Sequence, residues 1–395
     1  MPTASQRIRG LLGGEDDAWS VFYRARRMKA AGEPVLELTI GEHDIGTDAT
    51  ILDEMHRAAR AGHTGYAAVP GIDALRDRVA ERLSAASGAV FTRDNVMITP
   101  GGQAGLFAAH HAALDEGDRG LMIDPYYATY PGTIRALGAV PVPVRAGPET
   151  GFQPQERDIA EAARQSGARS LLINTPNNPT GAVYGPETLQ GIARAARDFD
   201  LWVISDEVYD AQVWEGRHLP FAGRDGMFER TLTVGSMSKS HAMTGSRLGW
   251  VAGPAEVIED LVQLATHTTY GAPGFIQEAA LFALEAGTEA EEAVAAPFRR
   301  RRAQVMDRLA RQSLLRAAAP DGAMYVMIDV RATGLSGVAF AEALLDETRV
   351  AVMPGESFGE AAAGHVRVAM TLPDEAFAEA IDRLCAFAAR QARAA

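Results

Sequence analysis

The stretch from residue 170 to residue 206, SLLINTPNNPTGAVYGPETLQGIARAARDFDLWVISD, decides the fold. It holds two apolar runs, at 170–174 and 201–205, on either side of a helical pattern at 186–198. A short strand without polar–apolar alternation is buried on both faces, which is typical of a parallel sheet. A helix between two such strands is the crossover that parallel neighbours require, and such crossovers are right-handed. The stretch therefore predicts a strand–helix–strand unit of an α/β fold.

The same alternation extends outward in both directions. Strands are predicted at 95–99, 120–124, 139–144, 170–174, 201–205, 231–234 and 248–252, with helices at 105–114, 133–137, 157–165 and 186–198. This order predicts a large domain over residues 45–290, with a mostly parallel seven-stranded sheet covered by helices on both faces (α/β/α).

The pattern changes after about residue 290. A charged amphipathic helix at 296–312 precedes apolar segments at 324–330, 350–353 and 365–371 and a last helix at 375–390. These elements predict a smaller α+β domain of residues 291–395 together with 1–44. We expect the segment 1–44, an N-terminal arm, to pack with the C-terminal part or with a neighbouring subunit.

Composition excludes several classes of function. The 395 residues are 47% hydrophobic and 23% charged, and the net charge of −13 argues against nucleic acid or an anionic membrane as a partner. The four arginines at 299–302 are interpreted as a solvated or ion-paired helix face. No stretch approaches the roughly 20 apolar residues of a membrane span.

The compartment follows from the N-terminus and from cysteine usage. Glu15, Asp16 and Asp17, without a long apolar run, argue against a signal peptide. The single cysteine, Cys385, cannot form an internal disulfide and is expected in the core. We therefore expect a cytoplasmic protein, and no metal site.

Candidate site residues are sought just after the strands, because ligands of an open parallel sheet bind beyond the carboxyl ends of its strands. Residues 99–105, TPGGQAG, are either a phosphate cradle at a helix N-terminus or a structural turn. Residues 174–181, NTPNNPTG, are a rigid loop or an asparagine-capped turn. Asp206 directly follows an apolar strand. Its carboxylate either meets a cation such as a protonated ring nitrogen or lies at the surface rim.

Two basic clusters follow. Lys239 comes after the strand at 231–234, and Arg247 lies eight residues further on. Burial makes an amine nucleophilic, and a guanidinium suits a phosphate. Arg367 lies inside a predicted strand between Val366 and Val368, so it is either buried and binds an anion, such as a substrate carboxylate, or is solvated.

Together these clusters resemble the fold-type I pyridoxal-phosphate aminotransferases of class I/II, the group of aspartate aminotransferase. The motifs NNPTG, DEVY and SxSKxxxxxxxR occur in the family's order, and the resemblance runs from Gly41 to Arg367. It implies a transaminase of amino acid metabolism that uses pyridoxal 5′-phosphate to move an amino group from an L-amino acid to a 2-oxo acid. It also implies a homodimer with shared active sites.

The resemblance assigns roles around the cofactor ring. It implies that Lys239 is the Schiff-base lysine and also moves the proton at the substrate's α carbon. Asp206 matches the partner of the pyridinium nitrogen, which keeps the ring an electron sink. Tyr209 and Asn178 match the residues that hydrogen-bond the phenolic oxygen, and Tyr127 matches the aromatic that stacks on the ring.

The resemblance also assigns the phosphate and carboxylate sites. The residues matched to phosphate binding are Gly102, Gln103, Ser236, Ser238 and Arg247. Tyr66 matches a tyrosine that reaches the phosphate of the neighbouring subunit. Arg367 matches the arginine that binds the substrate's α-carboxylate, with Gly41 and Asn178 beside it.

Three positions bear on the substrate. After Gly41 and Glu42 the family commonly has proline, whereas this chain has His43, which is either a specificity residue or a polar loop residue. Some relatives that accept acidic substrates carry a lysine near the position of Gln103, and glutamine cannot make that ion pair. Tyr270 is a candidate substrate contact. The sequence does not identify the donor or the acceptor.

Three alternatives remain open. The same scaffold could serve β- or γ-elimination or replacement, cyclisation or oxidation in a specialised pathway, because the fold does not set the reaction. A nicotinamide-dependent oxidoreductase would leave Lys239 and Asp206 unexplained and lacks the G-x-G-x-x-G spacing. A non-catalytic regulator would need a DNA-binding segment for which this acidic chain has no room.

Overall fold

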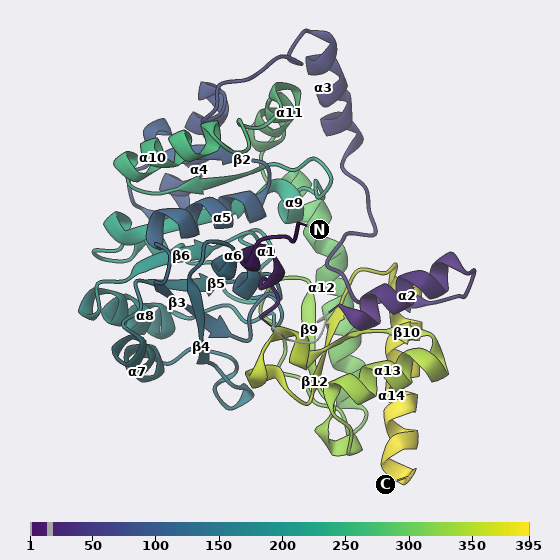
Figure 1. Cartoon of the computed structure of the whole chain (residues 1–395). Helices are drawn as coiled ribbons and strands as arrows, with labels where there is room; N and C mark the ends of the chain where they lie inside the picture. Colours follow the sequence, from purple (N-terminus) through teal and green to yellow (C-terminus); the bar gives the residue numbers. More distant parts are fainter. Residues whose placement is uncertain (1, 14–18, 395) are drawn as a thin grey trace.

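The computed structural model describes residues 2–13 and 19–394, and its centre is a seven-stranded sheet (Figure 1). Residues 14–18, including the predicted acidic stretch Glu15–Asp17, lie outside the described residues. In spatial order the strands are β2 (Val96–Thr99), β8 (Gly249–Ala252), β7 (Thr231–Ser236), β6 (Trp202–Asp206), β5 (Ser170–Asn174), β3 (Arg119–Asp124) and β4 (Val140–Arg145). β8 is antiparallel to both neighbours, and the other pairs are parallel. The α/β prediction is confirmed.

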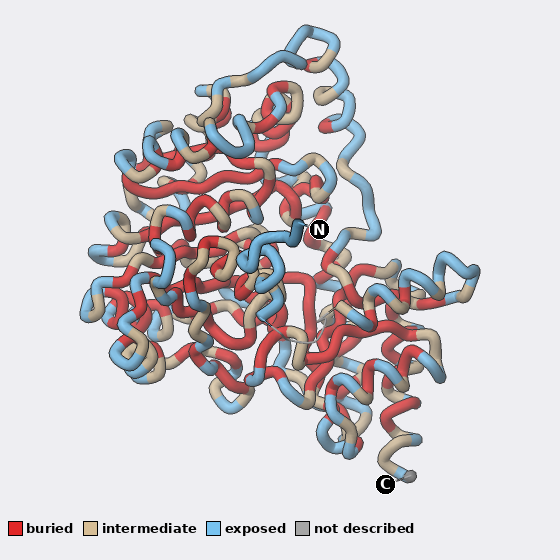
Figure 2. Tube along the Cα trace, in the orientation of Figure 1, coloured by how far each residue is buried: buried red, intermediate tan, exposed pale blue. Residues whose placement is uncertain are grey.

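The central strands β5, β6 and β7 are largely apolar, and each buries both faces. In β5, Leu171 and Ile173 pack with α7 (Glu156–Ser166) and α8 (Pro186–Asp198). Leu172 points the other way and packs with α5 (Gly102–Ala113), α6 (Tyr130–Ala136) and α10 (Ala255–Thr266). The strands accordingly form a buried layer between two layers of helices (Figure 2).

Around β2 the sheet is flanked by α3 (Ala49–Arg60), α4 (Asp73–Ser87) and α11 (Gly274–Glu285), which share one apolar cluster. The opposite edge strand, β4, carries Pro141 and Pro143, and Val140 on it is 46% exposed. Proline lacks the N–H that a sheet ladder needs, so it is found on edge strands.

A second apolar core lies beside the first sheet. Its three-stranded sheet, in the order β11 (Met353–Pro354), β12 (His365–Ala369) and β9 (Tyr325–Asp329), is antiparallel. β1 (Leu36–Glu37) pairs in parallel with β10 (Val350–Ala351). The core also takes residues from α2 (Ser20–Ala30), α12 (Glu289–Ala310), α13 (Gly337–Thr348) and α14 (Asp374–Ala394).

The N-terminal segment is divided between the two bodies. Val21, Ala25 and Leu38 belong to the second core, together with residues from 298 to 388. In contrast, α1 (Gln6–Arg9) lies near α6: Arg7 pairs with Glu116 at 2.8 Å, just before β3. The domain limits, 45–290 and 1–44 with 291–395, stay a prediction that this distribution supports.

The helix α12 differs from its predicted span. It begins at Glu289 rather than at residue 296, so Pro297 lies in its interior rather than in its first turn. A proline in a helix interior removes one hydrogen bond and its ring crowds the preceding turn, and the turns after Pro297 offset this cost by packing Phe298, Val305 and Leu309 into the second core. The arginine run is ion-paired, as predicted, in the pairs Arg299–Glu292, Arg300–Asp374, Arg301–Asp44, Arg301–Asp374 and Arg302–Glu215.

Arg301 is nevertheless buried, which the sequence did not indicate. Its side chain is 3% exposed and donates two 2.8 Å hydrogen bonds to Asp44, one of 2.8 Å to Asp374 and one of 3.0 Å to the carbonyl of Met370. A buried guanidinium is tolerated when its donors are satisfied in this way. It joins the segment after β1 to α12 and to the start of α14.

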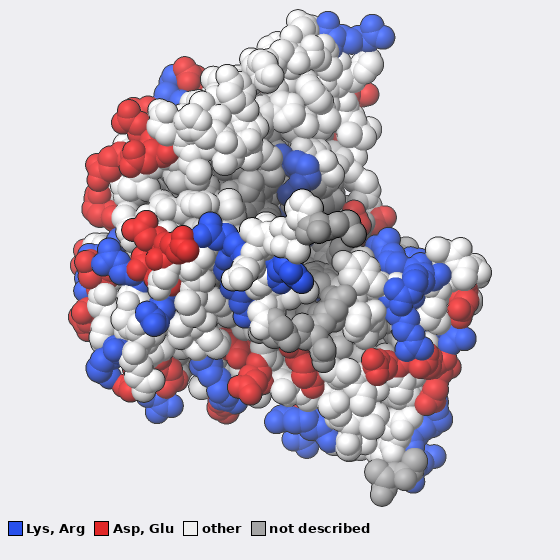
Figure 3. Space-filling model, in the orientation of Figure 1, with Lys and Arg blue, Asp and Glu red and all other residues white. Residues whose placement is uncertain are grey.

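The surface shows both signs of charge. Acidic and basic side chains are interspersed over the face in Figure 3, and basic residues gather over α2. Of these, Arg24 pairs with Asp346, and Arg26 and Lys29 pair with Glu37 at 2.8 and 3.1 Å. Cys385 is partly buried against the second core, and this burial raises the pKa of its thiol to about 11. Among the described residues, no helix is long and apolar enough to cross a membrane.

His110 on α5 is a buried histidine within an apolar environment. It is 0% exposed, and neither ring nitrogen meets a hydrogen-bonding group of the described residues. Desolvation lowers the pKa of His110 from 6.5 to about 3, so the folded protein holds it neutral while the unfolded chain protonates it below pH 6.5. Stability from this group is therefore present above pH 6.5 and is lost as the pH falls toward 3.

We predict that His110→Leu reduces the acid sensitivity of folding. Between pH 7.5 and pH 5 the wild type should lose about 2 kcal/mol of unfolding free energy through this histidine, and the variant should not. Urea unfolding of both proteins at the two pH values measures the difference. Equal losses in the two proteins would contradict the prediction.

Candidate active site

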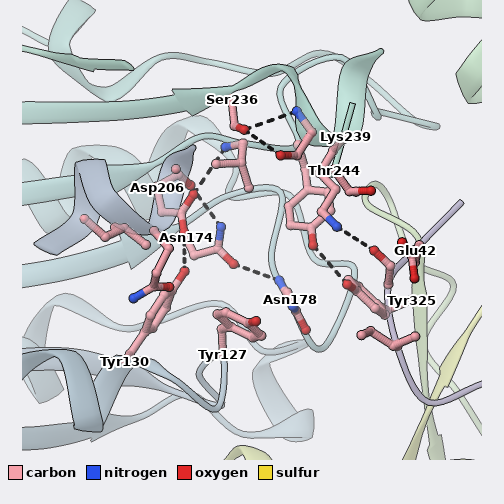
Figure 4. A pocket seen from close by; sticks show the side chains of 18 of the residues that line it. Glu42, Tyr127, Tyr130, Asn174, Asn178, Asp206, Ser236, Lys239, Thr244 and Tyr325 are labelled. Atoms are coloured by element: carbon pink, nitrogen blue, oxygen red, sulfur yellow. Dashed lines mark hydrogen bonds between the residues drawn. The ribbon is translucent and has the colours of Figure 1, made fainter. Parts of the chain in front are cut away.

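A pocket of about 270 Å³ opens at the carboxyl ends of β5, β6 and β7, facing the second sheet. The family resemblance assigns a catalytic, cofactor or carboxylate role to thirteen residues, and the pocket wall includes Gly41, Gly102, Gln103, Tyr127, Asn178, Asp206, Tyr209, Ser236, Ser238, Lys239, Arg247 and Arg367. Of these thirteen, only Tyr66 does not line it. Figure 4 shows how the side chains from the two sheets converge.

Lys239 enters the pocket from a short helix that directly follows β7. The strand ends at Ser236, whose side chain caps α9 (Met237–Ser240) by accepting from the N–H of Ser238 at 3.1 Å. The ammonium group of Lys239 donates to the carbonyl of Gly41. Desolvation, together with the nearby charges of Arg367 and Arg247, lowers the pKa of Lys239 to about 8, although Glu42 and Asp206 oppose the shift. An appreciable fraction of this amine is therefore neutral near physiological pH.

Asp206 lies at the end of β6 and is 4% exposed. Its carboxylate accepts from the hydroxyl of Tyr130 at 2.5 Å and the N–H of Val208 at 3.3 Å, and no described basic side chain forms an ion pair with it. Desolvation raises its pKa to about 6, and the two hydrogen bonds oppose that rise. The interpretation of Asp206 as a carboxylate at the surface rim is therefore wrong, because the residue is buried.

Arg367 is buried, so the solvated alternative is wrong. It is 1% exposed, and the rings of Tyr325 and Phe358 lie 4.5 and 4.4 Å from its guanidinium. One terminal nitrogen donates to Asn178 Oδ1 at 2.9 Å, the other donates to the carbonyl of Thr39, and Nε has no partner among the described residues. Burial lowers the pKa of Arg367, and no described carboxylate neutralises it.

The glycine turn before α5 faces Arg247. Gly101 has φ +84°, a backbone conformation that favours glycine, and a Cβ there would come within 2.4 Å of the Arg247 guanidinium, which would have to shift. No side chain caps the N-terminus of α5. The N–H groups at the start of α5, the Arg247 guanidinium and the hydroxyls of Ser236 and Ser238 line one part of the pocket, an arrangement suited to an anion that we call the anion cradle. The side chain of Gln103 is held by Thr133 and Thr129 of the α6 region at 2.8 and 3.1 Å.

The two remaining tyrosine candidates and His43 lie outside the pocket wall. Tyr66 and Tyr270 are 92% and 51% exposed, with their ring centroids 5.1 Å apart. His43 lies behind Lys239: its Nε2 is 3.0 Å from the Lys239 carbonyl, and its ring packs edge-on against Phe298. Burial lowers the pKa of His43 to about 4, so the ring is neutral and donates this hydrogen bond.

Sequence reasoning missed several pocket residues. Tyr130 bonds Asp206, and the hydroxyl of Tyr325 lies 3.0 Å from that of Tyr209. Asn174 places its amide oxygen 2.8 Å from the N–H of Asn178 and its amide nitrogen 2.9 Å from the carbonyl of Asp206. Asn174 belongs to the quoted loop and could have been found from its position at the end of a strand. The other two carry no comparable sequence signal.

Known proteins resemble this chain over nearly its full length. Residues 33–384 match the model of the aminotransferase class I and II family. The chain is 43% identical to the arginine–pyruvate transaminase of Pseudomonas aeruginosa over 98% of this chain and 97% of that protein. It is 36% identical to the aspartate/prephenate aminotransferase of Thermus thermophilus, covering 92% and 94% of the two chains.

Solved structures agree. The aspartate aminotransferase of Thermus thermophilus with maleate superposes with a TM-score of 0.91 at 34% identity, over 98% of this chain and 100% of that one. The family match and these relatives lead to one conclusion: the chain belongs to the class I and II aminotransferases.

Proposed function

We propose that the chain transfers an amino group from an L-amino acid to a 2-oxo acid with pyridoxal 5′-phosphate, which Lys239 binds as a Schiff base. The observation that carries this is the convergence of Lys239, Asp206, Arg247 and Arg367 in one pocket. The donor set fits the cofactor. A buried carboxylate without a cation suits a pyridinium nitrogen, and the anion cradle at Arg247 suits a phosphate.

The residues divide the work by their charge and position. The bound cofactor supplies an electron sink for the carbanion at the substrate's α carbon. Lys239, with a pKa of about 8, takes the proton from that carbon when the amino acid gives up its amino group. It returns a proton to the corresponding carbon of the 2-oxo acid when that acid receives the amino group. Asp206, held by Tyr130, keeps a ring nitrogen protonated. Arg367 binds the substrate carboxylate, with Asn178 and the backbone of Gly41 beside it.

The remaining contacts orient the cofactor. Tyr127 lines the pocket where an aromatic would stack on the ring, and the paired hydroxyls of Tyr209 and Tyr325 offer a donor to the phenolic oxygen, as Asn178 does. Ser236, Ser238, Arg247 and the N–H groups of Gly102 and Gln103 hold the phosphate. The alternative reactions of this scaffold, such as elimination or cyclisation, have no support from the relatives, which are named as aminotransferases.

We further propose a homodimer in which a second chain completes each site. Tyr66 is 92% exposed here although the family resemblance gives it a phosphate contact, and Tyr270 packs against it. A neighbouring subunit that covers this surface would accept Tyr66 into its own site. The location of the protein in the cytoplasm remains part of this proposal.

The donor is proposed to have a neutral or cationic side chain. The described cations of the pocket wall are Lys239, Arg247 and Arg367, and each has a role with the cofactor or the α-carboxylate. None is left for a distal carboxylate, and Gln103 cannot supply one. The relative named for arginine and pyruvate makes this pair the first to test.

Lys239→Ala should abolish the visible absorbance of the cofactor and reduce transamination by at least about 10³-fold, since it removes both the Schiff base and the proton carrier. The chain has two lysines, Lys29 and Lys239, so borohydride reduction should label one site. Lys29→Ala is the control. Lys29 lies on α2 and pairs with Glu37 of β1, so this substitution should leave the label and the rate unchanged. A label on Lys29 would overturn the assignment.

A donor panel tests the reaction and the substrate class. With pyruvate as acceptor, kcat/KM for L-arginine should exceed that for L-aspartate by about 10-fold or more, because no cation meets the second carboxylate. In single turnover the cofactor should convert stoichiometrically to pyridoxamine phosphate. Release of ammonia without that conversion would favour the elimination alternative.

Hybrid dimers test the shared site. Tyr66→Ala should weaken cofactor binding about 10-fold through the lost phosphate contact. Exchange of subunits between Tyr66→Ala and Lys239→Ala dimers should then restore one wild-type site in each hybrid. If Tyr66 serves its own chain, the mixture recovers nothing. Tyr23→Ala, which removes another exposed tyrosine, should bind cofactor normally.

A further inference from the structure

Asp124 ends β3 at the same sheet edge as the pocket, but it does not line the pocket. Its side chain turns to the segment before β12. The N–H of Ala361 lies 3.3 and 3.2 Å from the two carboxylate oxygens, and the N–H of Glu360 also donates to the carboxylate. Asp124 thereby caps η7 (Glu360–Ala362), a short 3₁₀ helix. Asp124 as a whole is 4% exposed.

The approach of Asp124 to this segment is close enough to constrain its sequence. Gly359 has φ +112°, and a Cβ there would lie 2.1 Å from Asp124 Oδ1. One residue earlier, the carbonyl of Phe358 accepts from the N–H of Tyr126 at 2.9 Å. The end of β3 therefore holds the backbone on both sides of Gly359.

Phe358 connects this contact to the site. It is 0% exposed, and its ring lies 4.4 Å from the guanidinium of Arg367. Arg367 has no charge partner among the described residues, so its position depends on the rings of Phe358 and Tyr325 and on two hydrogen bonds. A shift of Phe358 would change the wall against which Arg367 packs.

We propose that Asp124 is a positioning residue for substrate binding: by holding η7 and Phe358 it orients Arg367 toward the substrate's α-carboxylate. This rests on the proposed function, which gives Arg367 that role. Asp124 itself touches neither cofactor nor substrate. Arg145 on β4, whose charge acts on Asp124, pairs with Glu149, and the hydrogen bonds to the carboxylate come from the backbone of η7.

The test uses two reagents that condense with the bound cofactor, one with a carboxylate and one without. Aminooxyacetate presents a carboxylate to Arg367, whereas methoxyamine does not. The loss of cofactor absorbance gives a second-order rate constant for each with the holoenzyme. Measurements are made at pH 8, because burial raises the pKa of Asp124 to about 6 and its carboxylate is then ionised.

Asp124→Ala should lower the rate constant for aminooxyacetate about 10-fold while that for methoxyamine stays within about 2-fold, because only the carboxylate contact is misplaced. Asp124→Asn should recover most of the loss, since its amide oxygen still accepts from η7. Phe358→Leu should reproduce the selective loss for aminooxyacetate. It provides the test if Asp124→Ala does not fold. Ser336→Ala is the control, because it removes the cap of α13 and should leave both rate constants unchanged.

Each outcome decides between the proposals. Equal losses for both reagents in Asp124→Ala, or no loss in either Asp124→Ala or Phe358→Leu, would overturn the positioning role. Arg367→Lys is the reference. If it leaves the ratio of the two rate constants unchanged, the proposed role of Arg367 itself fails. If it changes the ratio while the Asp124 and Phe358 variants do not, only the positioning role fails.

Discussion

The site depends on one constraint, the removal from water of ionisable groups that have no opposite charge bonded to them. Asp206 and Arg367 are nearly fully buried, and Lys239 is desolvated beside them. Burial raises the pKa of Asp206 and lowers the pKa values of Lys239 and Arg367, so it favours the neutral form of each group. The fold compensates with hydroxyl, amide and carbonyl partners, so the charges stay available to a ligand. A ligand with a ring nitrogen, a phosphate and a carboxylate would satisfy all of these groups at once.

Charged side chains that are buried or half-buried form bridges between the elements around the site. Arg301 of α12 binds Asp44, just after the Gly41 carbonyl that accepts from Lys239, and Asp374 at the start of α14. Arg82 of α4 joins Asp210, beyond β6, to Glu291 at the start of α12, at 3.0 and 2.7 Å. Asp124 caps η7 from the end of β3. Removing one partner from any such bridge would leave the other buried and unsatisfied.

The fold could be predicted because its strands are apolar on both faces and occur at regular intervals. The position of the pocket could also be predicted, because the carboxyl ends of parallel strands lie at one edge of the sheet. Residues as distant in sequence as Asp206 and Lys239 meet there. Contacts made across the two cores could not be predicted. Phe358 and Tyr325 are ordinary core residues in sequence, and the charge of Arg301 suggested a solvated face. Pro297 also misplaced the start of α12, because a proline that usually opens a helix lies inside this one.

The edge strand β4 has a consequence for assembly. In a strand the N–H groups of alternate residues point to opposite sides, and proline has none, so Pro141 and Pro143 cannot donate along the outer side of β4. A further strand laid against that side would find acceptors without matching donors. The seven-stranded sheet therefore resists extension from one molecule to the next at this edge, and fibre-like stacking of folded chains is disfavoured there.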